Sequence, residues 1–243
     1  MNQRTRHYGD AQRRPQAARR RRRWRWLALP LLLPLLIVLG LRWVNPPGTA
    51  FIVAWQLEHG RSADWRWRSL DAISPQLALA VVAAEDQRFP SHWGFDVEAI
   101  GSALKDRADG RGQRGASTIS QQVAKNLFLW SGASWLRKGL EAGLTVLIES
   151  SWSKRRVLEV YLNIAEFGDG VYGAEAAAQR FFGISAQRLS LHQSAQLAAL
   201  LPSPKKRSVS APTPAQNARV RWIEQQMRAL GGTAYLQSCC LSD

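Results

Sequence analysis

The feature that most constrains this chain is an uncharged apolar run that directly follows a run of arginines. Residues 27–41 read LALPLLLPLLIVLGL, and Trp24, Trp26 and Trp43 flank them. A helix needs about 20 apolar residues to cross ~30 Å of hydrocarbon. Residues 24–44 reach that length when Arg25 and Arg42 extend their charged ends toward the interface. The run therefore predicts one transmembrane helix over residues 26–44.

The basic residues are concentrated before this run. Residues 1–25 hold ten arginines and one acid, Asp10, which accounts for +9 of the formal net charge of +15. Such a stretch also suits a nucleic-acid-binding arm, because it releases counterions from phosphate polymers. The apolar run that follows favours a membrane instead, and no nucleic-acid partner is predicted. Because basic segments stay on the cytoplasmic side, residues 1–25 are predicted to be cytoplasmic and residues 45–243 to lie on the far side.

A cleaved signal peptide is the alternative interpretation of this N-terminus. The apolar run is followed by Arg42, Trp43 and the sequence Asn45-Pro46-Pro47 rather than by a small-residue cleavage site. A retained anchor is therefore favoured. With 243 residues, the chain has room for this anchor and one sizeable domain.

Helix start and stop signals recur through the rest of the chain and predict a mainly α fold. Caps are expected at Ser74 before Pro75, at Asp96 for a helix to about Lys105, and at Ser153 for a helix to Tyr161. Ser190 and Gln193 form a capping box before a helix that Pro202 stops. Pro214 is expected to open a last helix that ends at Gly231-Gly232.

Three other segments have less regular patterns. Residues 45–73 contain Trp55, Trp65 and Trp67, which must pack on something, but helix and strand remain equally open there. Residues 106–115 (DRADGRGQRG) and 203–213 are predicted to be loops. The two cysteines, Cys239 and Cys240, are adjacent, which is too close for an ordinary unstrained bridge.

One acid stands out because of its apolar surroundings. The segment from Leu77 to Ala84 is apolar without interruption, which predicts a helix buried on all sides, and Glu85 follows it. Burial and the negative end of the helix dipole both disfavour an ionised carboxylate and raise its pKa. Such a group suits general-base catalysis, although a structural, hydrogen-bonded acid is the alternative.

Two polar segments follow. Arg137, Lys138 and Glu141 lie three and four residues apart, so they share one face of a helix; taken alone, this is equally the pattern of a solvated ion pair. Residues 115–126 (GASTISQQVAKN) offer many hydroxyl and amide groups at a helix start. This arrangement can receive anionic or sugar oxygens, or simply cap the helix.

Taken together, these segments resemble the peptidoglycan glycosyltransferase family, and most of all its monofunctional, single-span branch. The resemblance rests on four blocks in order: residues 85–96 (EDQRFPSHWGFD), residues 115–126, the RKGLE sequence of residues 137–141, and residues 154–163. It implies a lysozyme-like, two-lobed helical domain that polymerises lipid II into glycan strands with inversion at the anomeric carbon. It also implies a bacterial inner-membrane location with a periplasmic catalytic domain, and a role in cell-wall biogenesis and cell shape.

The resemblance assigns roles to individual residues. Glu85 matches the general base, and Glu141 matches a second acid that helps to organise the leaving pyrophosphate. Asp86, Phe89 and His92 fall in the first motif and support it. The substrate-binding positions implied are Ser117, Thr118, Gln121, Gln122, Lys125, Asn126, Arg137 and Lys138. Fixed cations among them suit a leaving group that develops negative charge.

The chain departs from the family pattern at two positions. Ala116 stands where the family usually has a second glycine, and Ala133 stands where relatives commonly carry an arginine. The second change removes one expected phosphate contact, which affects substrate affinity rather than reaction type.

Two other functions are compatible with parts of this pattern. A lysozyme-like hydrolase also uses two carboxylates, but it has no pyrophosphate that would require Lys125, Arg137 and Lys138. A non-catalytic membrane scaffold would not need Glu85 and Glu141. No metal-ligand cluster is visible; a divalent cation, Mg²⁺ or Mn²⁺, could assist the pyrophosphate. The expected partners are lipid II, nascent glycan, the inner membrane and proteins of cell division or elongation.

Overall fold

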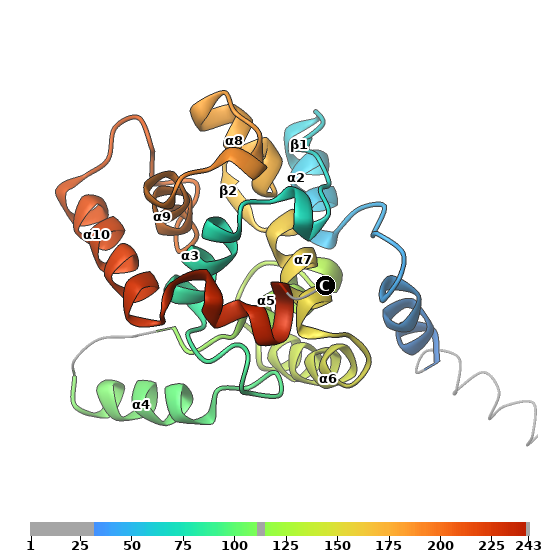
Figure 1. Ribbon diagram of the computed structural model, residues 1–243. Helices are drawn as coiled ribbons and strands as arrows, with labels where there is room; N and C mark the ends of the chain where they lie inside the picture. Colours follow the sequence, from blue (N-terminus) through green and yellow to red (C-terminus); the bar gives the residue numbers. More distant parts are fainter. Residues whose placement is uncertain (1–31, 111–114, 242–243) are drawn as a thin grey trace, which may run out of the picture.

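The computed structural model describes residues 32–110 and 115–241, and these residues are mainly helical, as predicted (Figure 1). The α-helices that follow a helical segment at residues 32–41 are α2 (Ala50–His59), α3 (Pro75–Glu85), α4 (Val97–Ala108), α5 (Ile119–Phe128), α6 (Trp135–Ser151), α7 (Lys154–Ile164), α8 (Ala174–Phe182), α9 (Leu191–Leu200) and α10 (Pro214–Ala229). Short turns of other helix types are η1 (Leu70–Ala72), η2 (Ala186–Arg188), η3 (Gly232–Leu236) and η4 (Gln237–Leu241).

The predicted caps are present. The side chains of Ser74, Asp96 and Ser153 each accept a backbone N–H in the first turn of α3, α4 and α7. The Ser190–Gln193 capping box opens α9, and α9 ends at Leu200, before Pro202. Each cap supplies an acceptor for one of the N–H groups that the helix itself leaves unpaired. The cap positions were therefore readable from local sequence.

Two helices run further than predicted, and one loop is correspondingly shorter. Helix α4 continues to Ala108 and α7 continues to Ile164. The prediction that the loop begins at residue 106 was therefore wrong, because Lys105 and Arg107 extend the helix and their charges suit its C-terminal end. Residues 111–114 lie outside the described residues. The predicted loop at residues 203–213 contains no helix or strand.

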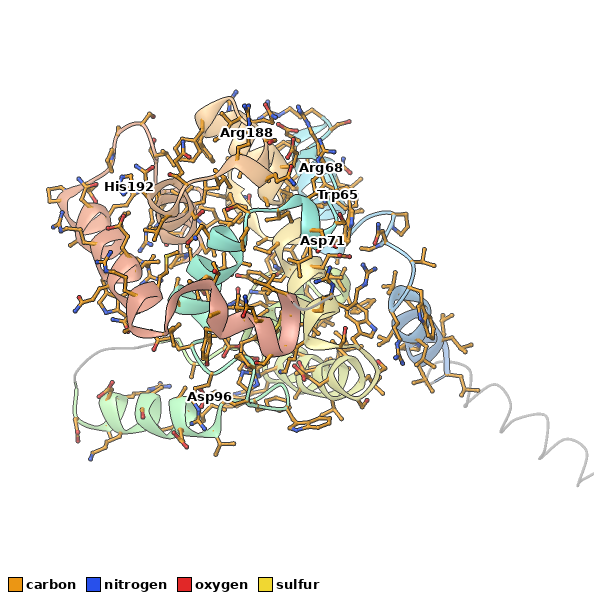
Figure 2. All side chains as sticks on the ribbon, in the orientation of Figure 1. Trp65, Arg68, Asp71, Asp96, Arg188 and His192 are labelled. Atoms are coloured by element: carbon orange, nitrogen blue, oxygen red, sulfur yellow. A yellow bond between two sulfur atoms is a disulfide. The ribbon has the colours of Figure 1, made fainter. Side chains whose placement is uncertain are left out.

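The undecided segment at residues 45–73 contains both kinds of structure. It forms α2, the strand β1 (Asp64–Trp65) and η1. Strand β1 pairs in parallel with β3 (Val171–Tyr172), and β3 pairs antiparallel with β2 (Glu166–Gly168). Trp65 and Arg68 thus lie beside α8, at the opposite end of the molecule from Asp96 at the start of α4 (Figure 2). Long-range strand pairing of this kind leaves little trace in a local pattern.

Helix α3 lies at the centre of the fold. Residues 77–83 are at most 1% exposed, which confirms the prediction of a helix buried on all sides. It packs against α9 and α10, while α5 packs against α6 and α7 (Figure 1). The C-terminal end of α3, with Glu85, hydrogen-bonds to α5 and contacts α10.

The N-terminal helical segment contacts the domain at the junction of α6 and α7. The indole N–H of Trp152 donates to the carbonyl of Val38 at 2.8 Å, and Arg156 donates to the carbonyls of Leu41 and Val44 at 3.0 and 2.8 Å. Val38 is fully buried. No helix in residues 32–110 or 115–241 is long and apolar enough to cross a membrane. Part of the predicted span, residues 26–31, and the predicted basic tail, residues 1–25, lie outside the described residues.

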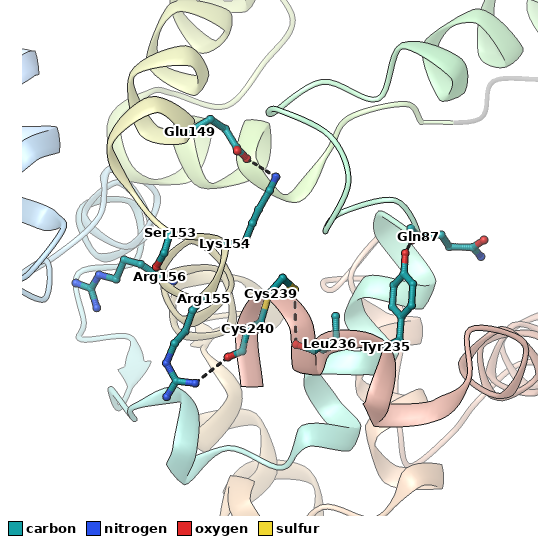
Figure 3. The surroundings of a disulfide bond; sticks show 10 residues. All are labelled: Gln87, Glu149, Ser153, Lys154, Arg155, Arg156, Tyr235, Leu236, Cys239 and Cys240. Atoms are coloured by element: carbon teal, nitrogen blue, oxygen red, sulfur yellow. Dashed lines mark hydrogen bonds and ion pairs between the residues drawn. A yellow bond between two sulfur atoms is a disulfide. The ribbon is translucent and has the colours of Figure 1, made fainter. Parts of the chain in front are cut away.

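The C-terminal segment returns to the core instead of extending away from it. Cys240 is 1% exposed, and its carbonyl accepts a hydrogen bond of 2.7 Å from Arg155 on α7 (Figure 3). Cys239 and Cys240 form a disulfide in η4, a bridge between adjacent residues whose spacing offered no reason to expect an ordinary one. A bridge between adjacent residues needs no second chain segment, only a tight turn that brings both sulfur atoms to the same side.

Candidate active site

Glu85 occupies the last turn of α3, and each of its carboxylate oxygens has its own partner. Oε2 accepts from Nε2 of Gln122 at 3.1 Å, and Oε1 lies 3.4 Å from Nη2 of Arg219. Burial raises the pKa of Glu85, while Gln122, Arg219 and Arg207 act in the opposite direction. The raised pKa agrees with the sequence expectation, and it is what a general base that works near neutral pH requires.

The orientation of Gln122 is fixed from its other side. The hydroxyl of Tyr161, on α7, donates to Oε1 of Gln122 at 3.1 Å, so the amide NH₂ faces Glu85. Burial, and then the nearby charges of Glu85 and Asp86, raise the pKa of Tyr161 well above its ordinary value. Tyr161 therefore remains a neutral donor, and the chain from Tyr161 to Gln122 to Glu85 holds the carboxylate in one place.

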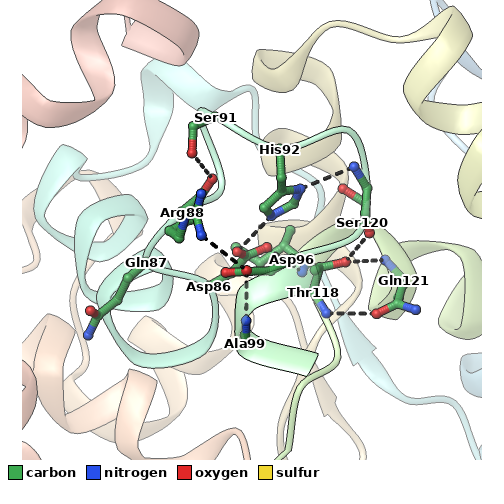
Figure 4. A network of polar contacts seen from close by, with 12 residues as sticks. Asp86, Gln87, Arg88, Ser91, His92, Asp96, Ala99, Thr118, Ser120 and Gln121 are labelled. Carbon is green, nitrogen blue, oxygen red and sulfur yellow. Dashed lines mark hydrogen bonds and ion pairs between the residues drawn. The ribbon is translucent and has the colours of Figure 1, made fainter. Parts of the chain in front are cut away.

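The first motif is joined to the start of α5 by buried hydrogen bonds (Figure 4). Oδ2 of Asp86 accepts from the backbone N–H of Ile119 at 2.9 Å, and Oδ1 lies 2.8 Å from Nε2 of His92. Because Nδ1 of His92 accepts from the N–H of Gly94 at 3.1 Å, the imidazole proton is on Nε2 and donates to Asp86. The hydroxyl of Thr118 donates to the carbonyl of Gly94 at 2.7 Å. Asp86 and His92 are buried, and they shape the site by holding the start of α5.

Gly94 is needed for this link. Its φ of +82° is in the left-handed region, and a Cβ there would lie 2.7 Å from Cγ2 of Thr145 and 2.9 Å from Cγ of Glu149. We expect Gly94→Ala to lower the free energy of unfolding by about 1–3 kcal/mol, measured by chemical denaturation. Gly101→Ala is the control, since Gly101 lies in α4 with open space around it and should gain about 0.5–1 kcal/mol. Equal effects of both substitutions would contradict this prediction.

The residues predicted on α5 separate into two groups. The side chains of Thr118 and Gln121 form the capping box of the helix and are at most 4% exposed, so their polar atoms are used within the fold. Gln122 and Lys125 are partly exposed one turn apart, and both interact with Glu85. Ser117 is exposed, and Asn126 is 9% exposed with its Oδ1 lacking a partner. Phe89 is fully buried beneath the Nζ of Lys154, 4.6 Å from its ring centre.

The second acid holds two cations. Glu141 is 2% exposed; Oε2 accepts from Nη1 of Arg137 at 2.6 Å, and Oε1 pairs with Nζ of Lys138. Nε of Arg137 also donates to the carbonyl of Gly132 at 2.7 Å. This cluster is therefore not a solvated ion pair, because its carboxylate is buried. Glu141, on α6, therefore holds the charged ends of Arg137 and Lys138.

Lys125 connects the two acids. Burial lowers the pKa of Lys125; the charge of Glu141 raises it, those of Arg137 and Lys138 lower it, and that of Glu85 raises it. The ammonium is thus within electrostatic range of both carboxylates and both other cations. Among the described residues it has no hydrogen-bond partner, and its Nζ lies 5.5 Å from the centre of the Phe51 ring. Lys125 is therefore the residue that links Glu85 electrostatically to Glu141, Arg137 and Lys138.

Arg219 and Tyr161 are the contributors that sequence reasoning missed. Tyr161 lies within the fourth block, but the sequence assigned it no role. Arg219 lies in α10, outside all four blocks. Helix α10 carries three arginines: Arg219, Arg221 and Arg228. Arg219 reaches Glu85 and the other two are exposed, but no signal in the sequence distinguishes them. An open pocket of about 390 Å³ at residues 88–98 is lined by His92 but not by Glu85 or Glu141.

Comparison with known proteins agrees with this geometry. The transglycosylase family model matches residues 53–228. A biosynthetic peptidoglycan transglycosylase of Xanthomonas campestris pv. campestris (strain B100) is 53% identical over 93% of this chain and 95% of its own length. Proteins of the same description from Stutzerimonas stutzeri (strain A1501) and Pseudomonas entomophila (strain L48) are 54% and 57% identical over 87% and 82% of this chain, and over 88% and 87% of their own lengths.

A partly buried acid near a set of fixed cations, on a helical domain, suits a group-transfer enzyme with an anionic leaving group. Together with these comparisons, it shows that the chain belongs to the transglycosylase family and is a peptidoglycan glycosyltransferase.

Proposed function

We propose that this enzyme polymerises lipid II, transferring a glycan from a lipid-pyrophosphate donor to a sugar hydroxyl of the acceptor. The observation that carries the proposal is the place of Lys125 on α5, one turn after the Gln122 that binds Glu85, where it interacts electrostatically with Glu85 and with Glu141, Arg137 and Lys138. A base and a cation set that share one site can act on the two ends of a single displacement. The proposed domain is lysozyme-like, with two lobes and the site in a groove between them.

In the proposed reaction, Glu85 removes the proton of the acceptor hydroxyl. The acceptor oxygen forms a bond to the anomeric carbon of the donor, while the bond from that carbon to the pyrophosphate oxygen breaks. A single displacement inverts the anomeric centre. The proton ends on Glu85 and is later lost to water, and the negative charge ends on the lipid pyrophosphate. Lys125, Arg137 and Lys138 stabilise that charge as it develops.

In this mechanism Glu141 orients the cations and does not react itself. Both of its oxygens are already paired with Arg137 and Lys138, and its exposed fraction is 2%. Gln122 positions the base. Ser117, Thr118, Gln121 and Asn126 are proposed to line the sugar-binding region, with Thr118 and Gln121 acting through the shape of the α5 start.

A divalent cation, Mg²⁺ or Mn²⁺, is proposed to arrive bound to the pyrophosphate of the substrate. Within residues 32–110 and 115–241 there is no group of three or more acidic, histidine or cysteine side chains that could hold a metal ion. Because the oxygens of Glu141 are occupied by two cations, the residues present fit a metal poorly unless the substrate supplies ligands.

The two rival functions have distinct outcomes in one set of assays. Polymer formed from lipid-linked disaccharide by the purified full-length protein supports the proposal, whereas cleavage of finished glycan without polymer would favour a lysozyme-like hydrolase. A non-catalytic scaffold would still restore wall synthesis in cells with both Glu85 and Glu141 changed to Gln. The cations at the site argue against the hydrolase, which has no diphosphate to bind.

We also propose a location on the bacterial inner membrane. Residues 1–25 would be cytoplasmic, residues 26–44 would span the membrane, and residues 45–243 would be periplasmic. This location would keep the site beside a lipid-linked substrate and near proteins of cell division or elongation, and it suits a role in cell-wall biogenesis and cell shape. The support is the sequence of the N-terminus, with its arginines before an uncharged apolar run.

Removing residues 1–31 is expected to lower the polymerisation rate on lipid vesicles without unfolding the domain. Confinement to a membrane raises the effective concentration of a lipid substrate, by analogy with tethered binding. The cut precedes residue 32 because Val38 is buried and bonded to Trp152, so a cut at residue 45 would also remove part of the core. The readout is the ratio of rates on vesicles and in detergent; an equal ratio for full-length and shortened protein would contradict the prediction.

A further inference from the structure

Arg219 is the cation nearest to the proposed base, and it comes from a part of the chain that contributes nothing else to the site. Its Nη2 lies 3.4 Å from Oε1 of Glu85 and 3.5 Å from the carbonyl oxygen of Ala84. Among the described residues, Glu85 is the only carboxylate within ion-pairing distance of Arg219. The guanidinium is therefore not part of a wider structural ion-pair network.

The position of Arg219 is set by the packing of α10. Val220, Ile223 and Met227 are at most 3% exposed and belong to the main core. Gln226 accepts from Nε2 of Gln87 at 3.2 Å, two residues after Glu85. Helix α10 is thus anchored on α3 and α9 along the turns that follow Arg219, so the approach of this side chain to Glu85 is a fixed feature of the fold.

Two partners from different helices hold the two oxygens of Glu85. Gln122 on α5 binds Oε2 and Arg219 on α10 approaches Oε1. Nε of Arg219 is buried without a partner, so the guanidinium is not saturated by the protein. A side chain that accepts this desolvation and makes one acidic contact is better explained by a task at that acid than by a contribution to stability.

We propose that Arg219 is a positioning residue for the catalytic base: it holds Oε1 of Glu85 and keeps the carboxylate ionised until the acceptor hydroxyl arrives. This rests on the proposed role of Glu85. A base buried by α3 and its neighbours tends to take up a proton and become inactive. A cation beside it favours the carboxylate, and contact through one oxygen only leaves the other lone pairs to receive a proton.

Several charged and titratable groups face Glu85 besides Arg219, and they set the sign of the expected effect. Burial raises the pKa of Glu85, as does the charge of Asp86 on the same element; Gln122 on α5, Arg219 on α10 and Arg207 in the loop before α10 lower it. Lys125 on α5 and Tyr161 on α7 also interact with Glu85. Removal of Arg219 therefore takes away one of the charges that lower the pKa of Glu85. The effect of burial is then less compensated, and the pKa of Glu85 rises further.

The test is the pH dependence of kcat/KM for polymerisation by the full-length protein. Because the base must be deprotonated, Arg219→Gln should move the acid limb of the profile to higher pH by about one pH unit. On that limb, activity falls about tenfold, and above it activity returns close to that of the wild type. Arg219→Lys retains a positive charge and should restore much of the limb. The control is Arg221→Gln, an exposed arginine two residues away on the same helix.

The outcomes separate this role from a structural one. An acid limb that stays in place in Arg219→Gln, at any level of activity, overturns the proposal, and so does unfolding of both the Gln and the Lys variants. A lower unfolding midpoint alone would reduce activity at every pH and would not move the limb. Failure of the role assigned to Glu85 is detected independently, because Glu85→Gln would then remain active.

Discussion

Glu85→Gln is expected to slow glycan polymerisation by a factor of at least about 10² to 10⁴, the contribution typical of a positioned general base. The amide retains the size of the side chain and can still contact Gln122 and Arg219, so the surroundings of residue 85 keep their shape. What is lost is the ability to take the proton of the acceptor hydroxyl. The measurement is the initial rate of polymer formation from lipid-linked disaccharide by purified full-length protein.

Glu58→Gln is the matched control, because Glu58 is an exposed acid on α2. Folding is monitored by thermal unfolding over a range of pH. Since burial raises the pKa of Glu85, its protonation stabilises the folded state below the unfolded pKa, and this contribution is lost as pH rises through the folded pKa. The Gln variant should therefore gain stability relative to the wild type as pH rises. Retained polymerisation in Glu85→Gln would remove this residue from the mechanism.

The second large effect is expected for Lys125→Ala, with a loss of about 10² to 10³ in kcat, the size seen when one fixed donor to a developing charge is removed. Lys125 lies among Arg137, Lys138, Glu141 and Glu85, and burial lowers its pKa. The folded protein thus holds this cation at a cost, which the leaving diphosphate would offset. Removing it should weaken donor use far more than folding.

The control for Lys125 is Lys105→Ala, which removes an exposed lysine from α4. Arg137→Ala should also weaken donor use, but it leaves the buried Glu141 with one partner fewer, so its unfolding midpoint should fall more than that of Lys125→Ala. A fall in midpoint that parallels the loss of activity in Lys125→Ala would mean that this lysine serves the fold instead of the reaction.

Local signals predicted much of this protein correctly. The caps at Ser74, Asp96 and Ser190 are present because a cap depends on a few neighbouring residues. The burial of residues 77–83 followed from an apolar run with no polar face. The raised pKa of Glu85 agrees with its place at the end of that run. The ends of α4 and α7 were misjudged for different reasons: basic residues extend α4 at its C-terminal end, whereas the last residues of α7 are buried in the core.

Other features depended on contacts between distant segments. The pairing of β1 with β3 joins residues about a hundred positions apart, and neither short strand has a pattern of its own. Thr118 and Gln121 look like ligand-binding residues in the sequence, yet their side chains close a capping box beneath Gly94. The bridge between Cys239 and Cys240 depends on the tight turn of η4 against α7.

The amino-acid sequence by itself determined several helix starts, the buried core helix and the family, and it singled out the two acids and their cations, because each of these features is encoded within short stretches of residues. Only the tertiary structure decided that Lys125 faces both acids and that Arg219 reaches Glu85. The physical reason is that electrostatic and hydrogen-bonding partners act over a few ångströms in space, whatever their separation in the chain. The packing of α10 on α3 creates that proximity for Arg219.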